Sequence, residues 1–372
     1  MDNHVIMFVL CVLWILPYSA AFTADCCHVT WTAEARNVSC SGCGLQDVPK
    51  DLPINTTELN LRNNSLSILL RESFFNLVSL KSLNLSMNKL FLISPGAFDD
   101  LGNLEYLDLS DNNLNLSSFA TSTFRILNSL KCLNIQRNTL HLLKSYPEDA
   151  LSYLSQLESL TIDIFEGFNF GNGFLKTNLN TLEINFIGKE WVSLRNSSFQ
   201  GLRNSNISYL NINAPIRKLE TDYLSPFSKL TSFSLISRRT MPIKGVLRAL
   251  YGLRERTLES LSLIANGMLY DGMQHLVKAD LLYLGTICVR ELDLTNNSIG
   301  SITMEAIISW TKRTCLEVLN LSKNQFYTAQ MITLLNLFPV ITYADFSYMR
   351  YMRIRKRTIP FTKQVLFLPR HL

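Results

Sequence analysis

Residues 80–90 read LKSLNLSMNKL and residues 104–114 read LEYLDLSDNNL, so one pattern is written twice, 24 residues apart. Both copies have the form L-x-x-L-x-L-x-x-N-x-L. The L-x-L portion predicts a short strand whose two leucines point to the same side, because side chains alternate along a strand. The Asn predicts a turn out of the strand, with its amide bonded to backbone groups of the turns above and below.

A fixed period in the twenties with this spelling is typical of the leucine-rich repeat. One repeat cannot bury its leucine face alone, so repeats must stack. We therefore predict an α/β leucine-rich repeat solenoid, a horseshoe with a parallel concave β-sheet. About twelve repeats are expected over residues 54–345, after an N-terminal cysteine cap at 26–53.

The repeats fall into three groups according to the Asn. Four regular repeats end at Asn64, Asn88, Asn112 and Asn138, and Phe74, Phe98 and Phe124 predict a buried aromatic spine behind them. In the irregular centre, about 155–240, the strand pattern persists without the Asn, at Leu160-x-Ile162, Leu182-x-Ile184, Leu210-x-Ile212 and Phe233-x-Leu235. The Asn returns at Asn266, Asn297 and Asn324, before a last strand predicted at Ile341-x-Tyr343. Loss of the Asn ladder predicts a change in twist and curvature.

The concave face is first described by the residue between the two inward side chains of each strand. In order these are Asn60, Asn84, Asp108, Asn134, Thr161, Glu183, Asn211, Ser234, Ser262, Asp293, Asn320 and Thr342. They are polar and short, and none is an aromatic or arginine anchor of the kind that interface hot spots use. Asn84 and Asn320 also lie in glycosylation sequons. We therefore expect that the concave face is not the main ligand surface.

The overall charge of +5 comes from the end of the chain. The basic C-terminal tail or incomplete repeat, 346–372, holds seven Lys or Arg and no acidic residue, which leaves 28 basic and 30 acidic side chains elsewhere. A near-neutral body argues against a general polyanion binder. The tail itself is interpreted either as a site for anionic lipid or nucleic acid, or as a solvated loop.

Residues 1–21 predict a signal peptide, because an apolar run at 5–16 too short to cross a bilayer is followed by small residues. Secretion makes the N-x-S/T sequons meaningful. The expected glycosylation sites are Asn37, Asn55, Asn63, Asn84, Asn115, Asn196, Asn206, Asn296 and Asn320. No later stretch reaches eighteen consecutive apolar residues, so no transmembrane helix is expected after the signal.

An oxidising compartment predicts disulfides for most of the remaining cysteines. Vicinal pairing is geometrically poor, so Cys26 and Cys27 should each cross to Cys40 or Cys43, and the order stays open. Cys288 and Cys315 occupy equivalent positions in stacked repeats, about 5 Å apart, and are expected to be bonded. Cys132 is left as a free thiol or an inter-chain link.

Two segments of the sequence deviate from the repeat. Residues 272–286 are interpreted as a helix on the convex side, and 167–174 (GFNFGNGF) as a protruding loop with an Asn-Gly turn. The irregular centre is the alternative ligand surface, and its candidate ligand-binding residues are Phe165, Phe168, Phe170, Arg217, Arg238 and Arg239. The competing interpretation is that the phenylalanines are core and the arginines solvated.

Nothing in the sequence indicates catalysis. The histidines (His4, His28, His141, His275 and His371) are scattered, and no nucleophile elbow, metal-binding pair or paired-carboxylate motif is present. We therefore predict a protein that is not an enzyme and has no cofactor or metal site.

Taken together, these features resemble the N-terminal part of a Toll-like receptor ectodomain. The resemblance covers residues 26–345 and rests on three features. These are the cysteine cap running into LQDVPKDLP (45–53), the repeats with PGAFDDLGNLEYLDLSDNNL (95–114), and the Asn ladder that lapses and returns. It implies an innate immune pattern-recognition receptor that binds a microbial ligand, with lipid or lipoprotein favoured over nucleic acid, and that forms a homo- or heterodimer with another leucine-rich repeat receptor.

Such receptors continue into a C-terminal cysteine cap, a transmembrane helix and a cytoplasmic TIR domain, which this sequence lacks. The chain is accordingly expected to be a fragment, a truncated gene model or a soluble form that acts as a decoy, secreted or on the extracellular face of a membrane. The full-length form would be a single-pass membrane protein. The alternative is a secreted or cell-surface leucine-rich repeat protein of adhesion or matrix.

Overall fold

The computed structural model describes residues 26–31, 36–138, 146–186, 191–266, 272–326 and 334–349. The predicted signal peptide and residues 350–372 of the basic tail lie outside these ranges. No helix within the described ranges is both long and apolar enough to cross a bilayer.

One sheet of 14 strands runs through the molecule, as expected for a solenoid. The first two strands form an antiparallel pair, and every later strand joins in parallel. In sheet order the strands are β1 (His28–Trp31), β2 (Arg36–Ser39), β3 (Glu58–Asn60), β5 (Ser82–Asn84), β7 (Tyr106–Asp108), β8 (Cys132–Asn134), β9 (Ser159–Asp163), β10 (Thr181–Asn185), β12 (Tyr209–Asn213), β14 (Ser232–Ile236), β15 (Thr257–Ile264), β17 (Cys288–Asp293), β19 (Val318–Asn320) and β20 (Tyr343–Asp345).

The return segments of the repeats carry short elements outside this sheet. Three two-stranded parallel sheets are β4 (Ile68–Leu69) with β6 (Leu92–Ile93), β11 (Val192–Leu194) with β13 (Ile216–Leu219), and β16 (Gln274–Leu276) with β18 (Ile299–Ile302). The α-helices described are α1 (Glu148–Leu151), α2 (Ile243–Arg248) and α3 (Met304–Ile308). Single 3-10 turns are η1 (Leu116–Ser118), η3 (Asn172–Lys176), η4 (Gln200–Leu202), η5 (Ala249–Leu253), η6 (Leu284–Thr286) and η7 (Arg313–Cys315).

The core is a continuous band of inward side chains behind the sheet. Leu83, Leu85, Leu107 and Leu109 are fully buried, because each strand directs alternate residues inward. The predicted aromatic spine is present. The rings of Phe74 and Phe98 stack at 6.2 Å and those of Phe98 and Phe124 at 6.3 Å, and all three side chains are buried.

The Asn ladder joins successive regular repeats. Asn112 Nδ2 donates to the carbonyl oxygens of Leu85 and Leu109 at 3.0 and 3.1 Å, and its Oδ1 accepts from the backbone N–H of Leu90 at 3.0 Å. Asn64, Asn88 and Asn138 make equivalent bonds. The residue before each of them has a positive φ, which turns the chain sharply out of the strand.

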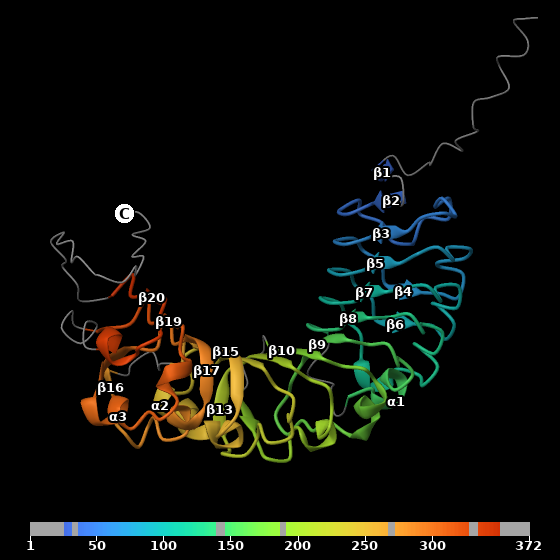
Figure 1. Cartoon of the computed structure of the whole chain (residues 1–372). Coiled ribbons are helices and arrows are strands. Elements are labelled where there is room, and N and C mark those ends of the chain that lie inside the picture. Colours follow the sequence, from blue (N-terminus) through green and yellow to red (C-terminus); the bar gives the residue numbers. More distant parts are fainter. Residues whose placement is uncertain are drawn as a thin grey trace, which may run out of the picture.

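In the irregular centre the strands lengthen instead of turning. β9, β10, β12 and β14 have five residues each, whereas β3, β5, β7 and β8 have three. The alternation continues to the residue directly after each of these strands, so a third inward side chain is buried there. These are Ile164, Phe186, Ala214 and Ser237. The predicted change in curvature is visible in Figure 1, where the column of regular repeats turns into the lower arc at β9 and β10.

The ladder resumes in the C-terminal repeats. Asn297 Nδ2 donates to the carbonyl oxygens of Leu263 and Leu294, and Asn324 Nδ2 to those of Leu294 and Leu321.

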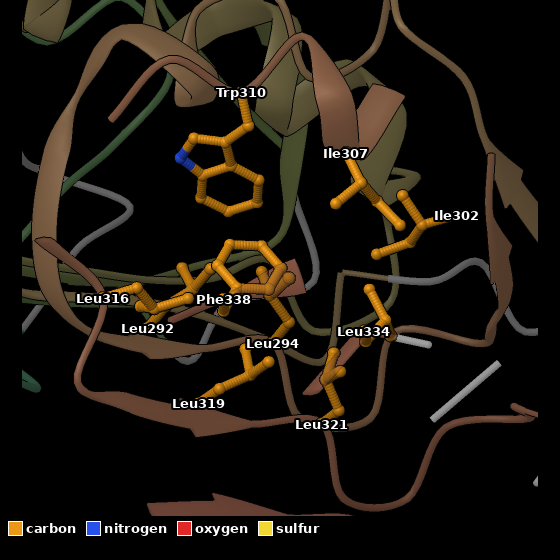
Figure 2. Close-up of a pocket in the computed structure, with 10 residues that line it drawn as sticks. All are labelled: Leu292, Leu294, Ile302, Ile307, Trp310, Leu316, Leu319, Leu321, Leu334 and Phe338. Carbon is orange, nitrogen blue, oxygen red and sulfur yellow. The ribbon is translucent and has the colours of Figure 1, made fainter. Parts of the chain in front are cut away.

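The core of the C-terminal repeats is tightly packed. Trp310 meets Phe338 edge to face at 5.2 Å among leucines and isoleucines, and the void they leave holds only about 10 Å³ (Figure 2). A disulfide between Cys288 and Cys315 links β17 to η7, with Cα atoms 5.4 Å apart.

The cap pairs its four cysteines as Cys26–Cys43 and Cys27–Cys40, which settles the order that the sequence left open. The cap's strand β2 lies parallel to β3 and so covers the first repeat.

Three sequence-based expectations about secondary structure are wrong. Residues 272–286 are not one helix, because β16 pairs with β18 and the buried carboxylate of Asp280 accepts from the N–H of Val277. Residues 167–174 do not protrude, since Phe170 exchanges backbone hydrogen bonds with Ser198 and Gly201 of the next repeat. The last strand is shifted by three residues, so that Asp345, and not Thr342, aligns with Asn320.

Candidate recognition surface

Two rows of side chains run along the whole concave face and alternate with the buried ones. The inner row is the set read from the sequence, with Asp345 in place of Thr342. The outer row lies two residues earlier on each strand, and the register aligns Glu58, Ser82, Tyr106, Cys132, Ser159, Thr181, Tyr209, Ser232, Ser260, Glu291, Val318 and Tyr343. Sequence reasoning missed this row because it considered only the residue between the inward pair.

The outer row supplies aromatic side chains to the concave face. Tyr106 and Tyr209 are 39% and 36% exposed, and Tyr343 is half-buried. The prediction that this face has no aromatic side chains is therefore wrong. Partial burial, followed by the nearby Asp108 carboxylate, raises the pKa of Tyr106 to about 12. Burial and then Glu183 also raise the pKa of Tyr209. Both phenols therefore stay protonated at neutral pH and can donate hydrogen bonds.

Cys132 is a free thiol in the middle of the outer row. It aligns with Tyr106 on one side and Ser159 on the other. Burial, and next the negative charge of Glu158, raises the pKa of its thiol. A thiol of that kind is a poor nucleophile at neutral pH, since the thiolate is the reactive form.

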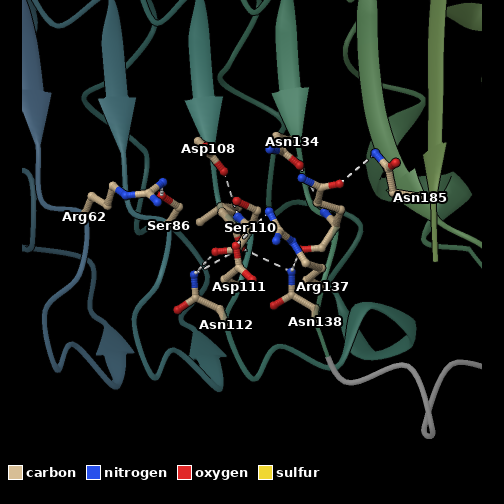
Figure 3. A network of polar contacts seen from close by, with 12 residues as sticks. Arg62, Ser86, Asp108, Ser110, Asp111, Asn112, Asn134, Arg137, Asn138 and Asn185 are labelled. Atoms are coloured by element: carbon tan, nitrogen blue, oxygen red, sulfur yellow. Dashed lines mark hydrogen bonds and ion pairs between the residues drawn. The ribbon is translucent and has the colours of Figure 1, made fainter. Parts of the chain in front are cut away.

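The ladder ends at a buried carboxylate on the concave rim. Asp163 Oδ2 accepts from the backbone N–H of Arg137, and its Oδ1 has no hydrogen-bond partner among the described residues. Burial, opposed by the Arg137 N–H, raises the pKa of Asp163 to about 7. Asn185, on β10, donates a 2.9 Å hydrogen bond to Gln136, which follows β8 on the other side of β9, and the Arg137 guanidinium pairs with Asp111 at 3.1 Å (Figure 3).

The candidate aromatic residues of the centre belong to the core. Phe168 and Phe170 are 3% and 1% exposed, and Phe165 is half-buried against the core. Phe170 stacks on Phe199 at 5.7 Å, and Phe199 contacts Phe227 at 5.1 Å, so these rings continue the aromatic spine. The assignment of Phe168 and Phe170 to ligand binding is therefore wrong. Their spacing departs from that of Phe74, Phe98 and Phe124, which hid their structural role.

The candidate arginines of the centre are exposed and lie near one another. Arg238 Nε donates to Asn213 Oδ1 at 2.8 Å, and an Arg239 guanidinium nitrogen donates to Asn296 Oδ1 at 3.1 Å. Thr240 Oγ1 donates to the Ile216 carbonyl at 2.9 Å, which brings Arg217 on β13 close to the same turn. Partial burial lowers the pKa of Arg238. The structure thus leaves the three cations exposed near one turn, while Phe168 and Phe170 are buried in the core.

The sequons distribute over several surfaces. Asn55, Asn63, Asn196 and Asn206 are exposed, whereas Asn37, Asn84, Asn115, Asn296 and Asn320 are half-buried. Asn84 and Asn320 lie in the inner concave row and Asn37 aligns with Glu58 of the outer row. Across the described part of the chain, no three His, Cys, Asp or Glu side chains are grouped so that they could hold a metal ion.

Part of the chain is similar in sequence to known leucine-rich repeat proteins. A leucine-rich repeat family model matches residues 54–114. Decorin of Gallus gallus is 48% identical over 57 residues, and biglycan of Xenopus laevis is 37% identical over 59 residues. The chain spans only 16% of the length of either relative.

Among solved structures, the chain is similar to the TLR13–ssRNA13 complex, with a TM-score of 0.52 and 22% identity over 85% of this chain and 49% of that one. Similarity at this level concerns the fold. Together with the family model and the parallel sheet, it shows a leucine-rich repeat fold.

Proposed function

We propose that this chain is the recognition part of an innate immune pattern-recognition receptor of the Toll-like kind. It binds a microbial ligand without catalysis, and signals through a homo- or heterodimer in a longer form or acts as a soluble decoy. The observation that carries the proposal is the lapse of the Asn ladder over four consecutive repeats. The solenoid changes its course there, and Arg217, Arg238 and Arg239 of this region are exposed.

The charge of the concave face favours a lipid or lipoprotein ligand over nucleic acid. Neither row contains Lys or Arg, and together they hold Glu58, Asp108, Glu183, Glu291, Asp293 and Asp345. Nucleic-acid grooves need cations along the phosphate backbone. The structural neighbour was solved with single-stranded RNA, but the two concave rows described in this chain offer no cations for a phosphate backbone. The void beside Trp310 holds about 10 Å³, so an acyl chain needs a surface site or an opened core.

Binding measurements on the secreted chain test the proposal. We expect a diacylated lipopeptide to bind and its deacylated peptide and a single-stranded RNA to bind at least tenfold more weakly. The double variant Arg238→Ala/Arg239→Ala should lose tenfold or more in lipopeptide affinity, about 1.4 kcal/mol or more. The matched control is Arg71→Ala/Lys89→Ala, which removes two exposed cations outside the centre. Tighter binding of RNA than of lipopeptide would overturn the ligand class.

The second candidate is a secreted or cell-surface adhesion or matrix protein. It is favoured by the decorin and biglycan matches, although these cover only the regular repeats. The coding sequence downstream of residue 372 separates the two candidates. A TIR domain supports the receptor, whereas a GPI signal or a matrix attachment supports the adhesion protein.

A further inference from the structure

The N-terminal end of the concave face contains an open hollow of about 320 Å³. It is lined by side chains of β1, β2, β3, β5 and β7, among them His28, Asn37, Glu58, Asn60, Asn84 and Tyr106. This volume lies at the lower end of the range, about 300–1,000 Å³, that holds small-molecule ligands. Its walls combine amide, hydroxyl and carboxylate groups with apolar surface, including the Tyr106 ring, so it suits a polyhydroxyl occupant that also has C–H faces.

Two sequons of this chain meet at that hollow. Asn37-Val38-Ser39 is on β2 and Asn84-Leu85-Ser86 is on β5, with only β3 between them. Neighbouring strands lie about 4.8 Å apart and Asn37 is offset from Asn84 by two residues along the strands, so the two asparagines are about 12 Å apart across the hollow.

The side chain of Asn84 is oriented for attachment of a glycan. Its Oδ1 accepts from the backbone N–H and from the hydroxyl of Ser86, at 2.9 and 2.7 Å. Its Nδ2 has no hydrogen-bond partner within the described ranges. The ladder residue Asn88 differs, because its Nδ2 is committed to the carbonyls of Leu61 and Leu85. In the sequon at Asn320, Nδ2 lies 3.4 Å from Asp293.

Tyr106 supplies an apolar wall beside Asn84. It lies on the adjacent strand, diagonally opposite, because Ser82 aligns with Tyr106 and Asn84 with Asp108. Diagonal neighbours on a sheet are about 7–8 Å apart, within reach of an aromatic side chain. A tyrosine ring offers an apolar face to the C–H side of a sugar and keeps its polar tip available for hydrogen bonds.

We propose that the hollow is filled by the protein's own carbohydrate: Asn84 carries an N-linked glycan whose first sugars lie against Tyr106, and Asn37 is a second attachment point on the opposite wall. In the transfer, Asn84 Nδ2 bonds to C1 of a sugar carried on a lipid diphosphate. The bond from C1 to the diphosphate oxygen breaks, the lipid diphosphate leaves, and Nδ2 gives up one proton. The inference rests on the passage through the secretory pathway that the proposed function requires, and not on the ligand.

The consequence is a division of the concave face. Carbohydrate covers it from β2 to β7, whereas neither concave row has a sequon asparagine in the part around Tyr209. A macromolecular ligand is thereby directed to the centre, between Asn84 and the second concave sequon at Asn320.

Site-resolved release of the glycans tests the inference on the unmodified sequence. The full chain is secreted from mammalian cells and treated with peptide N-glycosidase in ¹⁸O-labelled water, and each released site is identified by mass spectrometry. Asn84 should be occupied and, in the native protein, released at least tenfold more slowly than a glycan at the exposed Asn196, or at Asn55 if Asn196 is bare. After denaturation the rates should be equal.

Matched variants show whether the hollow causes the slow release. Tyr106→Ala should bring the release rate at Asn84 towards that of the exposed site. Asn84→Gln removes the glycan, and Asn60→Gln is its control on the same wall, because Asn60-Leu61-Arg62 is not a sequon. A bare Asn84 in the secreted protein, or an Asn84 glycan released natively as fast as the reference, would overturn the inference. Both outcomes are independent of lipopeptide binding, so the two proposals fail separately.

Discussion

The regular repeats over 59–138 and the irregular centre over 160–237 share one sheet but stabilise their turns by different means. In the regular repeats, a buried asparagine bonds to the backbone of two successive turns. In the centre, the strand continues for two more residues, and the residue directly after it is a third buried inward side chain, such as Ile164 or Phe186.

The difference shows what the asparagine does. Where it is present, a residue with positive φ precedes it, at Asn63, Met87, Asp111 and Arg137, and the chain leaves the sheet early. Where it is absent, backbone groups stay satisfied by the longer parallel pairing. The rim beyond the strand is then free to vary, and the candidate arginines lie on such a rim.

The largest expected effect is the loss of one ladder side chain. Asn112→Ala removes an acceptor for the Leu90 N–H and a donor to the carbonyls of Leu85 and Leu109. A buried backbone group without a partner costs about 1–3 kcal/mol, so the variant should lose about 4 kcal/mol of unfolding free energy. Urea denaturation followed by circular dichroism measures it.

The control for the ladder variant is Asn134→Ala, on the concave face one strand further along. Its Oδ1 accepts only the N–H of Gln136, at 3.2 Å, and the side chain is half-buried. We expect a loss below about 1 kcal/mol. Equal losses for the two variants would mean that the ladder does not stabilise the regular repeats in the way described.

The variant Ile164→Ala tests whether the third buried inward side chain stabilises the repeats of the centre. The side chain is fully buried, so its truncation should cost about 3 kcal/mol, within the range for buried aliphatic residues. Ile164→Asn sharpens the comparison. An asparagine placed there without the preceding turn should destabilise the protein more than the alanine does. If the Ile164→Asn protein is as stable as the native one, a ladder asparagine and a buried apolar side chain are interchangeable at this position.

We expect the stability of the protein to depend on pH through Asp163, which lies at the boundary between the two regions. Burial raises the pKa of Asp163 to about 7, above its ordinary value of 3.8, so the folded state holds this proton more tightly. The associated stability is therefore complete below about pH 4 and is lost as the pH rises through 7.

Asp163→Asn should remove this pH dependence. At pH 8 the variant should be more stable than the native protein by roughly 2 kcal/mol, less than the full shift because the amide must replace a carboxylate that accepts the Arg137 N–H. At pH 4 the two should be alike. Thermal unfolding at both pH values measures the difference, and a native protein that gains stability between pH 5 and 8 relative to the variant contradicts it.

Periodic features were predictable from the sequence, and non-periodic ones were not. The Leu and Asn spacing predicted the strands, the ladder and the spine of Phe74, Phe98 and Phe124. The burial of Phe168 and Phe170 was not predicted because their spacing follows no repeat, although hydrophobicity alone favours burial. The register of the last strand was predicted wrongly because Ala344 replaces the usual leucine at its inward position, and the pattern indicated Ile341 instead.

The candidate surface was only half predictable for a related reason. Reading the residue between two inward side chains finds one concave row, but alternation places a second row two residues earlier. That row contains Tyr106, Tyr209 and the free thiol, and only the register shows that it is continuous from the regular repeats into the centre.

The smallest expected effect lies on this continuous row, at Cys132→Ser. Cys132 aligns with Ser159 across the boundary, and Ser82 occupies the same row two strands earlier, so a serine suits the position in either region. The side chain is half-buried and outside the core, and the change in unfolding free energy should stay within about 0.5 kcal/mol. Thiol labelling is the complementary measurement. Since burial raises the pKa of Cys132, iodoacetamide should react more slowly with the native protein than with the urea-unfolded one at pH 7.5. A loss of several kcal/mol in the serine variant would show that the concave rows contribute to stability differently on the two sides of the boundary, and that the contrast between the regions extends beyond their turns.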